Sequence, residues 1–136
     1  IMDTLANLLT KIRNAYAVAK EEITAPVSKS NLAVLKVLVR EGYLSSVTIE
    51  PGTEEAREHL KIVLKYDHRT PVVGRIRRLS KPGRRVYASV SQIPRPKGGY
   101  GTIILSTPEG ILADRDAKKL GIGGELICEV IRGEGL

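Results

Sequence analysis

GGYGTIILSTPEGILADRDAKKLGIGGELICEVI is the sequence of residues 98–131, and it contains two apolar runs with β-strand character, 102–105 and 126–131. The first run leads directly into a small polar turn, residues 106–110. The second run is entered through a glycine-rich segment, residues 121–124. This pattern predicts two strands with a hydroxyl-rich turn at the end of one and a glycine hinge before the other.

A short helix is predicted between these strands, at residues 114–120. Asp114 is expected to cap its N-terminus, and Gly121 is expected to end it. Lys118 and Lys119 lie in the last turn, where they offset the negative end of the helix dipole. The strands, the turn and the hinge would together form a small surface of well-defined shape.

The first half of the chain predicts two amphipathic helices. Asp3 or Thr4 can cap the first helix, and Ser28 or Ser30 can cap the second, which Gly42 ends. The apolar positions of the first helix form one stripe: Leu5, Leu8, Leu9, Ile12, Ala15 and Tyr16. The inward positions of the second are expected to be Leu32, Leu35, Leu38 and Val39.

Strand patterns complete the first half and dominate the second. In the first half, an extended piece is predicted at 23–27. A hairpin is predicted with strands at 43–49 and 60–66 and an acidic loop at 51–58. A polar connection at 67–74 predicts a boundary that separates a domain of residues 1–68 from one of residues 69–136. Beyond it, strands are expected at 75–79 and 86–90, flanking a type II turn at 80–83, with a stiff extended linker at 93–97.

Composition and charge narrow the function classes. No apolar run approaches the roughly 20 residues of a membrane span, no secretory signal is visible, and a single cysteine fits a reducing compartment. The chain is therefore expected to be soluble and intracellular. Residues 1–68 hold equal numbers of acidic and basic residues, so the whole net charge of +7 lies in residues 69–136. Residues 69–97 contain no acid at all, which indicates a polyanion partner; the alternative is a solvated basic face.

Catalytic and metal-binding motifs are not recognisable. The two histidines, His59 and His68, lack metal-ligand spacing. Cys128 is expected to be a buried apolar residue on the same strand face as Leu126 and Val130. The glycines of 99–101 and 121–124 match neither the dinucleotide fingerprint nor a Walker loop and indicate tight backbone turns. The sequence predicts neither an enzyme nor a metal site or cofactor.

The turn at Ser106 and Thr107 is the more informative signal, although an ordinary surface turn is the alternative interpretation. Hydroxyls and backbone amides at a strand end can hydrogen-bond bases, riboses and phosphates. Gly123 and Gly124 would allow close backbone approach, and Glu125 can accept from a base or orient a neighbouring hydroxyl. The basic residues of 75–97 would supply sequence-independent attraction to phosphates, so the second half is predicted to bind irregular RNA.

Several motifs follow one another in order along nearly the full length: Asp3, LLTKIRNA at 8–15, REGY at 40–43, IRRLSKPGRRVY at 76–87, ILST at 104–107, Gly110, Asp114, Arg115, Ala117 and GGE at 123–125. Together they resemble the family of bacterial-type small-subunit ribosomal protein eight. The resemblance implies an α+β fold, with a small α/β N-terminal domain packed on a mostly β C-terminal domain that has one short helix. It also implies a structural constituent of the small ribosomal subunit that binds the central domain of its RNA directly and supports assembly.

The resemblance assigns RNA contacts residue by residue. The main contacts are Ser106, Thr107, Gly123, Gly124 and Glu125, with further ones from Lys81, Arg84, Arg85 and Tyr87. Secondary contacts are expected from Thr4, Lys11, Arg13, Asn14, Arg77 and Arg78. The chain departs from the family pattern at Pro108, Ala113 and Ile131 and in its extension 132–136. Because Pro108 stands where the family usually has a small hydroxyl residue, one polar contact is lost and the turn is stiffer.

The expected partners follow from this resemblance. They are small-subunit ribosomal RNA, neighbouring small-subunit ribosomal proteins and the chain's own messenger RNA, without a membrane or a small-molecule substrate. The expected location is the cytoplasmic ribosome, with an organelle ribosome as the alternative. The alternative function is an RNA-binding translational repressor that works off the ribosome.

Overall fold

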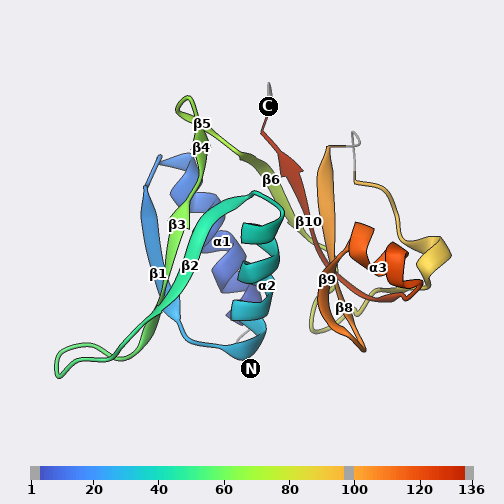
Figure 1. Cartoon of the computed structure of the whole chain (residues 1–136), viewed down its shortest axis with the longest axis horizontal. Coiled ribbons are helices and arrows are strands. Elements are labelled where there is room, and N and C mark those ends of the chain that lie inside the picture. Colours follow the sequence, from blue (N-terminus) through green and yellow to red (C-terminus); the bar gives the residue numbers. More distant parts are fainter. Residues whose placement is uncertain (1–3, 97–99, 134–136) are drawn as a thin grey trace. The chain divides into compact units, whose positions relative to one another are not determined.

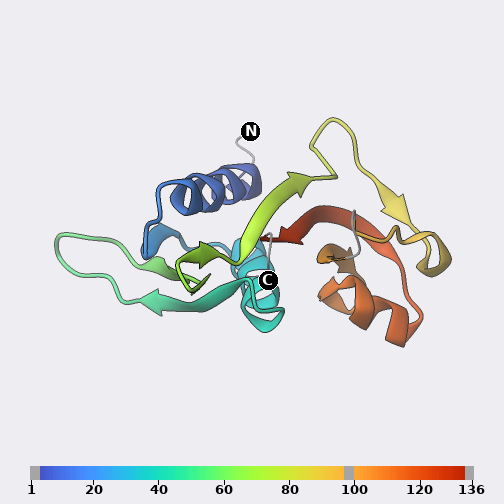
Figure 2. The same ribbon diagram turned by 90° about the horizontal axis from the view of Figure 1, so that it is seen from above.

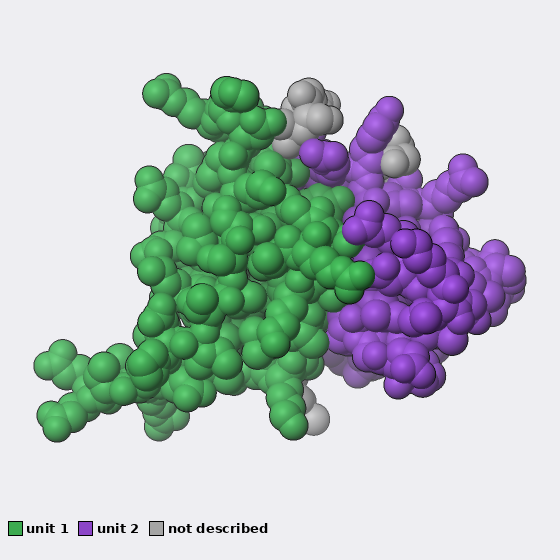
Figure 3. Space-filling model, in the orientation of Figure 1, with its two compact units in different colours: residues 1–72 green, residues 73–136 purple. Residues whose placement is uncertain are grey.

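The structure is a computed structural model that describes residues 4–96 and 100–133 (Figure 1). Asp3, residues 97–99 and the end of the C-terminal extension lie outside the described residues. The chain forms two compact units, residues 1–72 and 73–136, which Figure 3 colours green and purple. The predicted α+β fold class is confirmed.

Unit 1 contains the two predicted amphipathic helices. Helix α1 spans Thr4–Ala17 and buries the apolar stripe from Leu8 to Tyr16. Helix α2 spans Lys29–Arg40, and its N-cap is Ser28, whose hydroxyl accepts a bond from the backbone N–H of Asn31. The chain leaves α2 through Gly42, whose φ of +86° is a left-handed conformation that glycine adopts without strain. The buried face of α2 differs from the prediction, because Asn31 and Val34 are buried while Leu32 and Val39 are half-buried.

Three antiparallel strands form the sheet of unit 1, in the order β1-β3-β2. Their bounds are Glu22–Pro26 for β1, Leu44–Glu50 for β2 and His59–Leu64 for β3. Along β3 buried and half-buried residues alternate, so one sheet face packs against the helices. The acidic loop at 51–58 extends away from the helices of unit 1 (Figure 1, Figure 2).

The end of unit 1 contains a small hairpin that the sequence did not predict. Its strands are β4, Tyr66–Asp67, and β5, Thr70–Pro71. His68 and Arg69 turn the chain with φ of 49° and 70°, which non-glycine residues seldom adopt. The turn contains no asparagine or glycine, the residues typical of tight hairpin turns. Its sequence therefore resembles that of an open connection. The predicted domain boundary, between residues 68 and 69, falls inside the hairpin.

Unit 2 contains an antiparallel sheet in the order β6-β10-β8-β9, with β7 also paired to β10. The bounds are Val73–Arg78 for β6, Tyr87–Ala88 for β7, Gly101–Thr107 for β8, Gly110–Ala113 for β9 and Gly124–Arg132 for β10. The predicted strands are therefore present, but β9 and the short 3₁₀ helix at Val90–Gln92 were not predicted. Strand β9 escaped prediction because its four residues lie between a turn and a helix.

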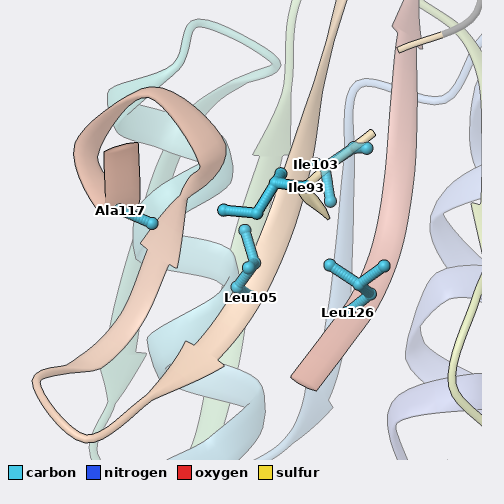
Figure 4. Packing of buried hydrophobic residues seen from close by; sticks show 5 residues of the cluster. All are labelled: Ile93, Ile103, Leu105, Ala117 and Leu126. Carbon is cyan, nitrogen blue, oxygen red and sulfur yellow. The ribbon is translucent and has the colours of Figure 1, made fainter. Parts of the chain in front are cut away.

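Helix α3, Asp114–Leu120, covers one face of this sheet. Ala117 of α3 packs there with Ile103, Leu105, Leu126 and Ile93 (Figure 4). The predicted helix and its end at Gly121, φ 69°, are confirmed. Its predicted cap is wrong, because the N-cap position is Ala113, and no side chain makes a capping bond there. Asp114 is the first helical residue, where a carboxylate is still favoured by the dipole.

Two local details differ from the sequence interpretation. The turn between β6 and β7 is centred on Pro82 and Gly83, and Lys81 and Arg84 exchange both backbone hydrogen bonds, each 2.9 Å. Gly83 lacks the positive φ that a type II turn requires, so the predicted turn type is wrong.

The predicted strand face of Cys128 is right for Val130 and wrong for Leu126. The register of β10 against β8 shifts between Leu126 and Cys128, whose partners are the adjacent residues Leu105 and Ile104. Since adjacent strand residues point to opposite faces, Cys128 does not share the face of Leu126. Its predicted burial is confirmed, with 0% exposure.

Candidate nucleic-acid interface

A row of three side chains crosses the sheet of unit 2 at the start of β10. Glu125 pairs with Tyr87 of β7 on one side and with Ser106 of β8 on the other. Directly paired residues of antiparallel strands point to the same face, and this face is opposite to that of Leu105 and Leu126 in the core. Tyr87 is 69% exposed, and Ser106 and Glu125 are half-buried. Three predicted contacts are thus brought together on one face.

Glu125 is held by residues from the turn between β6 and β7. Its Oε2 accepts a hydrogen bond of 2.6 Å from the hydroxyl of Ser80. The same oxygen accepts a charge-assisted bond of 3.1 Å from Nη1 of Arg85. The hydroxyl of Ser80 also accepts a bond of 3.0 Å from the backbone N–H of Val86. One carboxylate therefore fixes the turn between β6 and β7 (residues 79–86, the basic turn) onto β10.

Ser80 is the part of this arrangement that sequence reasoning missed. The sequence interpretation placed it at the start of a type II turn, yet it is only 1% exposed. A buried hydroxyl needs hydrogen-bond partners, and the carboxylate that accepts from Ser80 lies 45 positions away along the chain. The signal available was weak: a serine directly after Leu79, at the end of an apolar strand. Of the two roles considered for Glu125, the structure supports orientation of a neighbouring hydroxyl.

The paired glycines are required by the protein's own backbone. A Cβ on Gly124 would overlap the carbonyl oxygen of Ser106, and a Cβ on Gly123 would overlap that of Ala88. The start of β10 thus passes between β7 and β8 at a distance that only glycine permits. At these Cβ positions the space is filled by neighbouring strands, and a close approach of RNA to the two glycines stays a prediction.

The two hydroxyls of the predicted turn differ in their partners. Thr107 donates to the carbonyl of Gly110 at 2.8 Å and accepts from the backbone N–H of Glu109 at 3.1 Å, so its hydroxyl stabilises the β8–β9 turn that contains Pro108. The hydroxyl of Ser106 has no hydrogen-bond partner within residues 4–96 and 100–133. Ser106 is therefore the hydroxyl that can bind an external group.

A basic groove of about 670 Å³ lies on the opposite face of the same unit. Its lining includes five basic residues: Arg77, Arg78, Lys81, Arg84 and Arg95. One carboxylate, Glu129, also lines it and forms an ion pair of 3.5 Å with Nη2 of Arg77. Glu129 pairs across the strands with Ile103 of the core, and this register places it on the core face. The predicted basic contacts thus divide between two faces of the sheet.

The remaining predicted contacts belong to unit 1. Thr4, Lys11, Arg13 and Asn14 are exposed on α1. Thr4 and Lys11 line one small cavity, and Lys11 and Asn14 line another. Arg13 lines neither of these cavities.

The cysteine and the two histidines are the side chains that could take part in catalysis or metal binding. Burial raises the pKa of the Cys128 thiol to about 12, so the thiolate needed for nucleophilic attack is scarce at neutral pH. His59 contacts the carbonyl of Arg57, and His68 contacts Asp67 at the exposed β4–β5 turn. Within the described residues no group of three His, Cys, Asp or Glu is arranged to hold a metal ion. None of the helices described has the length and apolar content needed to cross a membrane.

Comparison with known proteins identifies similar chains. The family described as Ribosomal protein S8 matches residues 3–131. The chain is 46% identical to the small ribosomal subunit protein uS8 of Thermus aquaticus, over 96% of this chain and 99% of that protein. It is 45% identical to the proteins of the same name from Thermus thermophilus and from Alcanivorax borkumensis, over 96% of this chain in both cases and 99% and 98% of theirs.

Proposed function

The chain belongs to the ribosomal protein S8 family, and from this premise we propose that it binds the RNA of the small ribosomal subunit directly through unit 2. The relatives are named as small-subunit ribosomal proteins rather than as enzymes. We infer a structural role without catalysis, on the cytoplasmic ribosome, next to other small-subunit proteins. The central domain of the RNA and a role in assembly are the target and function that the family resemblance favours.

One observation carries the proposal: the row of Tyr87, Glu125 and Ser106 lies on one face, and no described residue pairs with the Ser106 hydroxyl. On the other side of Glu125, Tyr87 offers an exposed ring on which a splayed base can stack. Arg85, held by Glu125, places a cation at the same edge. This row would recognise a particular RNA structure through its shape and hydrogen bonds, while the basic turn attracts phosphates of any RNA.

Replacing Ser106 by alanine is expected to weaken binding to a small-subunit RNA fragment by roughly 1–3 kcal/mol, because an RNA group would lose its hydrogen-bond partner. The stability of the protein should hardly change, since the hydroxyl has no partner among the described residues. Filter binding at fixed salt measures the effect. Ser46→Ala is the matched control, because Ser46 is also a half-buried strand serine but lies in unit 1. Equal affinities for the two variants would contradict the assignment of Ser106.

Replacing Arg84 by alanine is expected to act differently. Arg84 is exposed at the rim of the basic groove, so its loss should weaken binding to all RNA sequences alike. The slope of log affinity against log salt should become shallower by about 0.7–1, the value for one phosphate contact. A salt titration of the variant measures this slope, with Arg57→Ala in the acidic loop of unit 1 as the control. An unchanged slope would remove Arg84 from the interface.

Direct binding is tested by chemical protection of small-subunit RNA with the purified protein. We expect protection within the central domain that Ser106→Ala weakens and Ser46→Ala leaves intact. Absence of protection anywhere in the RNA would refute the proposed function. Repression of the chain's own messenger RNA is favoured by no feature of the described residues, and we do not propose it.

A further inference from the structure

A small cavity of about 210 Å³ lies in unit 1, where the start of α1 meets the end of β1 and the start of α2. Leu8, Ala25 and Pro26 give it apolar walls. Its volume is below the roughly 300–1,000 Å³ of pockets for drug-sized ligands. The cavity therefore suits a fragment of the size of a single nucleobase.

Asn31 lines this cavity and supplies its unusual feature. The residue is only 4% exposed. Its side-chain oxygen, Oδ1, is buried and has no hydrogen-bond partner within the described residues. Unsatisfied buried polar atoms are rare in folded proteins, and each calls for an explanation. An external group that donates a hydrogen bond to Oδ1 would provide that explanation.

The surroundings of the cavity indicate what that group belongs to. Lys11 is exposed at its rim, and Ser28, the N-cap of α2, also lines it, so a cation and a positive helix end flank the opening. The cavity thus combines apolar walls, one acceptor that needs a donor and a positive rim. A nucleotide has the matching parts: a flat base with an amino group at its edge and a phosphate next to it. An asparagine amide is well suited to hydrogen-bond adenine.

We propose that this cavity takes up one unpaired adenine or cytosine of the bound RNA, with its exocyclic amino group donating to Oδ1 of Asn31 and its phosphate near Lys11. The inference rests on the proposed function, because the base belongs to the RNA that the chain binds. It adds a base-specific contact in unit 1 to the surface in unit 2. Uracil has no exocyclic amino group, so cytosine is the pyrimidine that this contact would favour.

Dimethyl sulfate probing of the complex tests this proposal, because the reagent modifies the pairing edges of unpaired adenine and cytosine. At saturating protein, one such base is expected to become unreactive with the wild-type protein. With Asn31→Leu, that base should regain the reactivity of free RNA while the other protections remain. Lys11→Ala should restore part of the reactivity. Lys36→Ala is the control, since Lys36 is exposed on α2 and does not line the cavity.

The fold of the variants can be checked in the same samples. Leucine has the same branching as asparagine and removes an unsatisfied buried oxygen, so Asn31→Leu should unfold at the same or a higher urea concentration than the wild type. If Asn31→Leu protects the RNA as the wild type does, the inference is overturned and the proposed function stands. If the wild-type protein protects no base at all, the proposed function and this inference both fail.

Discussion

Replacing Gly124 by alanine is expected to destabilise unit 2 by about 3 kcal/mol or more, the range of the most damaging core substitutions. The added Cβ would overlap the carbonyl oxygen of Ser106, a backbone atom that cannot move aside without breaking the pairing of β10 with β8. The row of Tyr87, Glu125 and Ser106 depends on that pairing. RNA binding should therefore be lost together with stability. Urea unfolding measures the free energy, and filter binding measures the affinity.

Gly83→Ala is the matched control for this prediction. Gly83 has no heavy atom within 4 Å of an added Cβ, and its φ is not positive. Alanine there should leave the free energy of unfolding unchanged or raise it by up to about 1 kcal/mol, because it restricts the unfolded chain. If Gly124→Ala and Gly83→Ala were equally stable, the close approach of β10 to β8 described here would be wrong.

Replacing Glu125 by alanine is expected to have the second largest effect. The change leaves the hydroxyl of Ser80 buried without its acceptor, which costs about 1–3 kcal/mol of stability. Arg85 loses the carboxylate that holds it, so the basic turn is no longer fixed onto β10. We expect specific RNA binding to weaken by roughly 1–3 kcal/mol as well. Calorimetric titration with an RNA fragment and urea unfolding measure the two quantities.

The sign of the effect on affinity is the informative part. Removing a negative charge near RNA should by itself strengthen binding, because phosphates repel carboxylates. Glu109→Ala, in the neighbouring turn, removes an exposed carboxylate and should leave affinity equal or slightly higher. Glu125→Ala should weaken it, since this carboxylate positions cationic and hydroxyl groups. Tighter RNA binding by Glu125→Ala would contradict the positioning role.

Glu125→Gln separates charge from shape. The glutamine side chain can still accept from Ser80, so most of the stability should be retained. Its pairing with Arg85 is weaker, because a charge-assisted bond becomes a neutral one. This partly exposed pair contributes only about 0.2–1 kcal/mol, so the glutamine variant should fall between the wild type and the alanine variant.

Much of the fold was predictable because its signals are local. The apolar stripe of α1, the serine cap of α2 and the left-handed glycine after α3 each depend on residues within a few positions of one another. The strands of both units follow from runs of apolar residues between turn residues. The short β4–β5 hairpin and β9 were missed because two to four residues carry too little pattern to distinguish a strand from a loop.

The candidate site was predictable in its residues and less so in its roles. Ser106, Tyr87 and Glu125 were assigned by resemblance, and the register places them in one row. Whether they bind RNA stays a prediction, which the variants above test. The register shift between Leu126 and Cys128 moved Cys128 to the other face of the sheet. An extra residue in a strand leaves no mark in the apolar pattern when the residues on both faces are buried.

By itself, the sequence determined the fold class, the concentration of charge in residues 69–136 and the resemblance to a ribosomal protein family. Composition and short-range periodicity suffice for these features. Tertiary structure alone decided which atoms are free for a partner. Glu125 meets Ser80 across 45 positions, and Gly124 meets the backbone of Ser106 on another strand. Contacts between distant segments arise only when strands pair, because the register of that pairing sets which groups face each other.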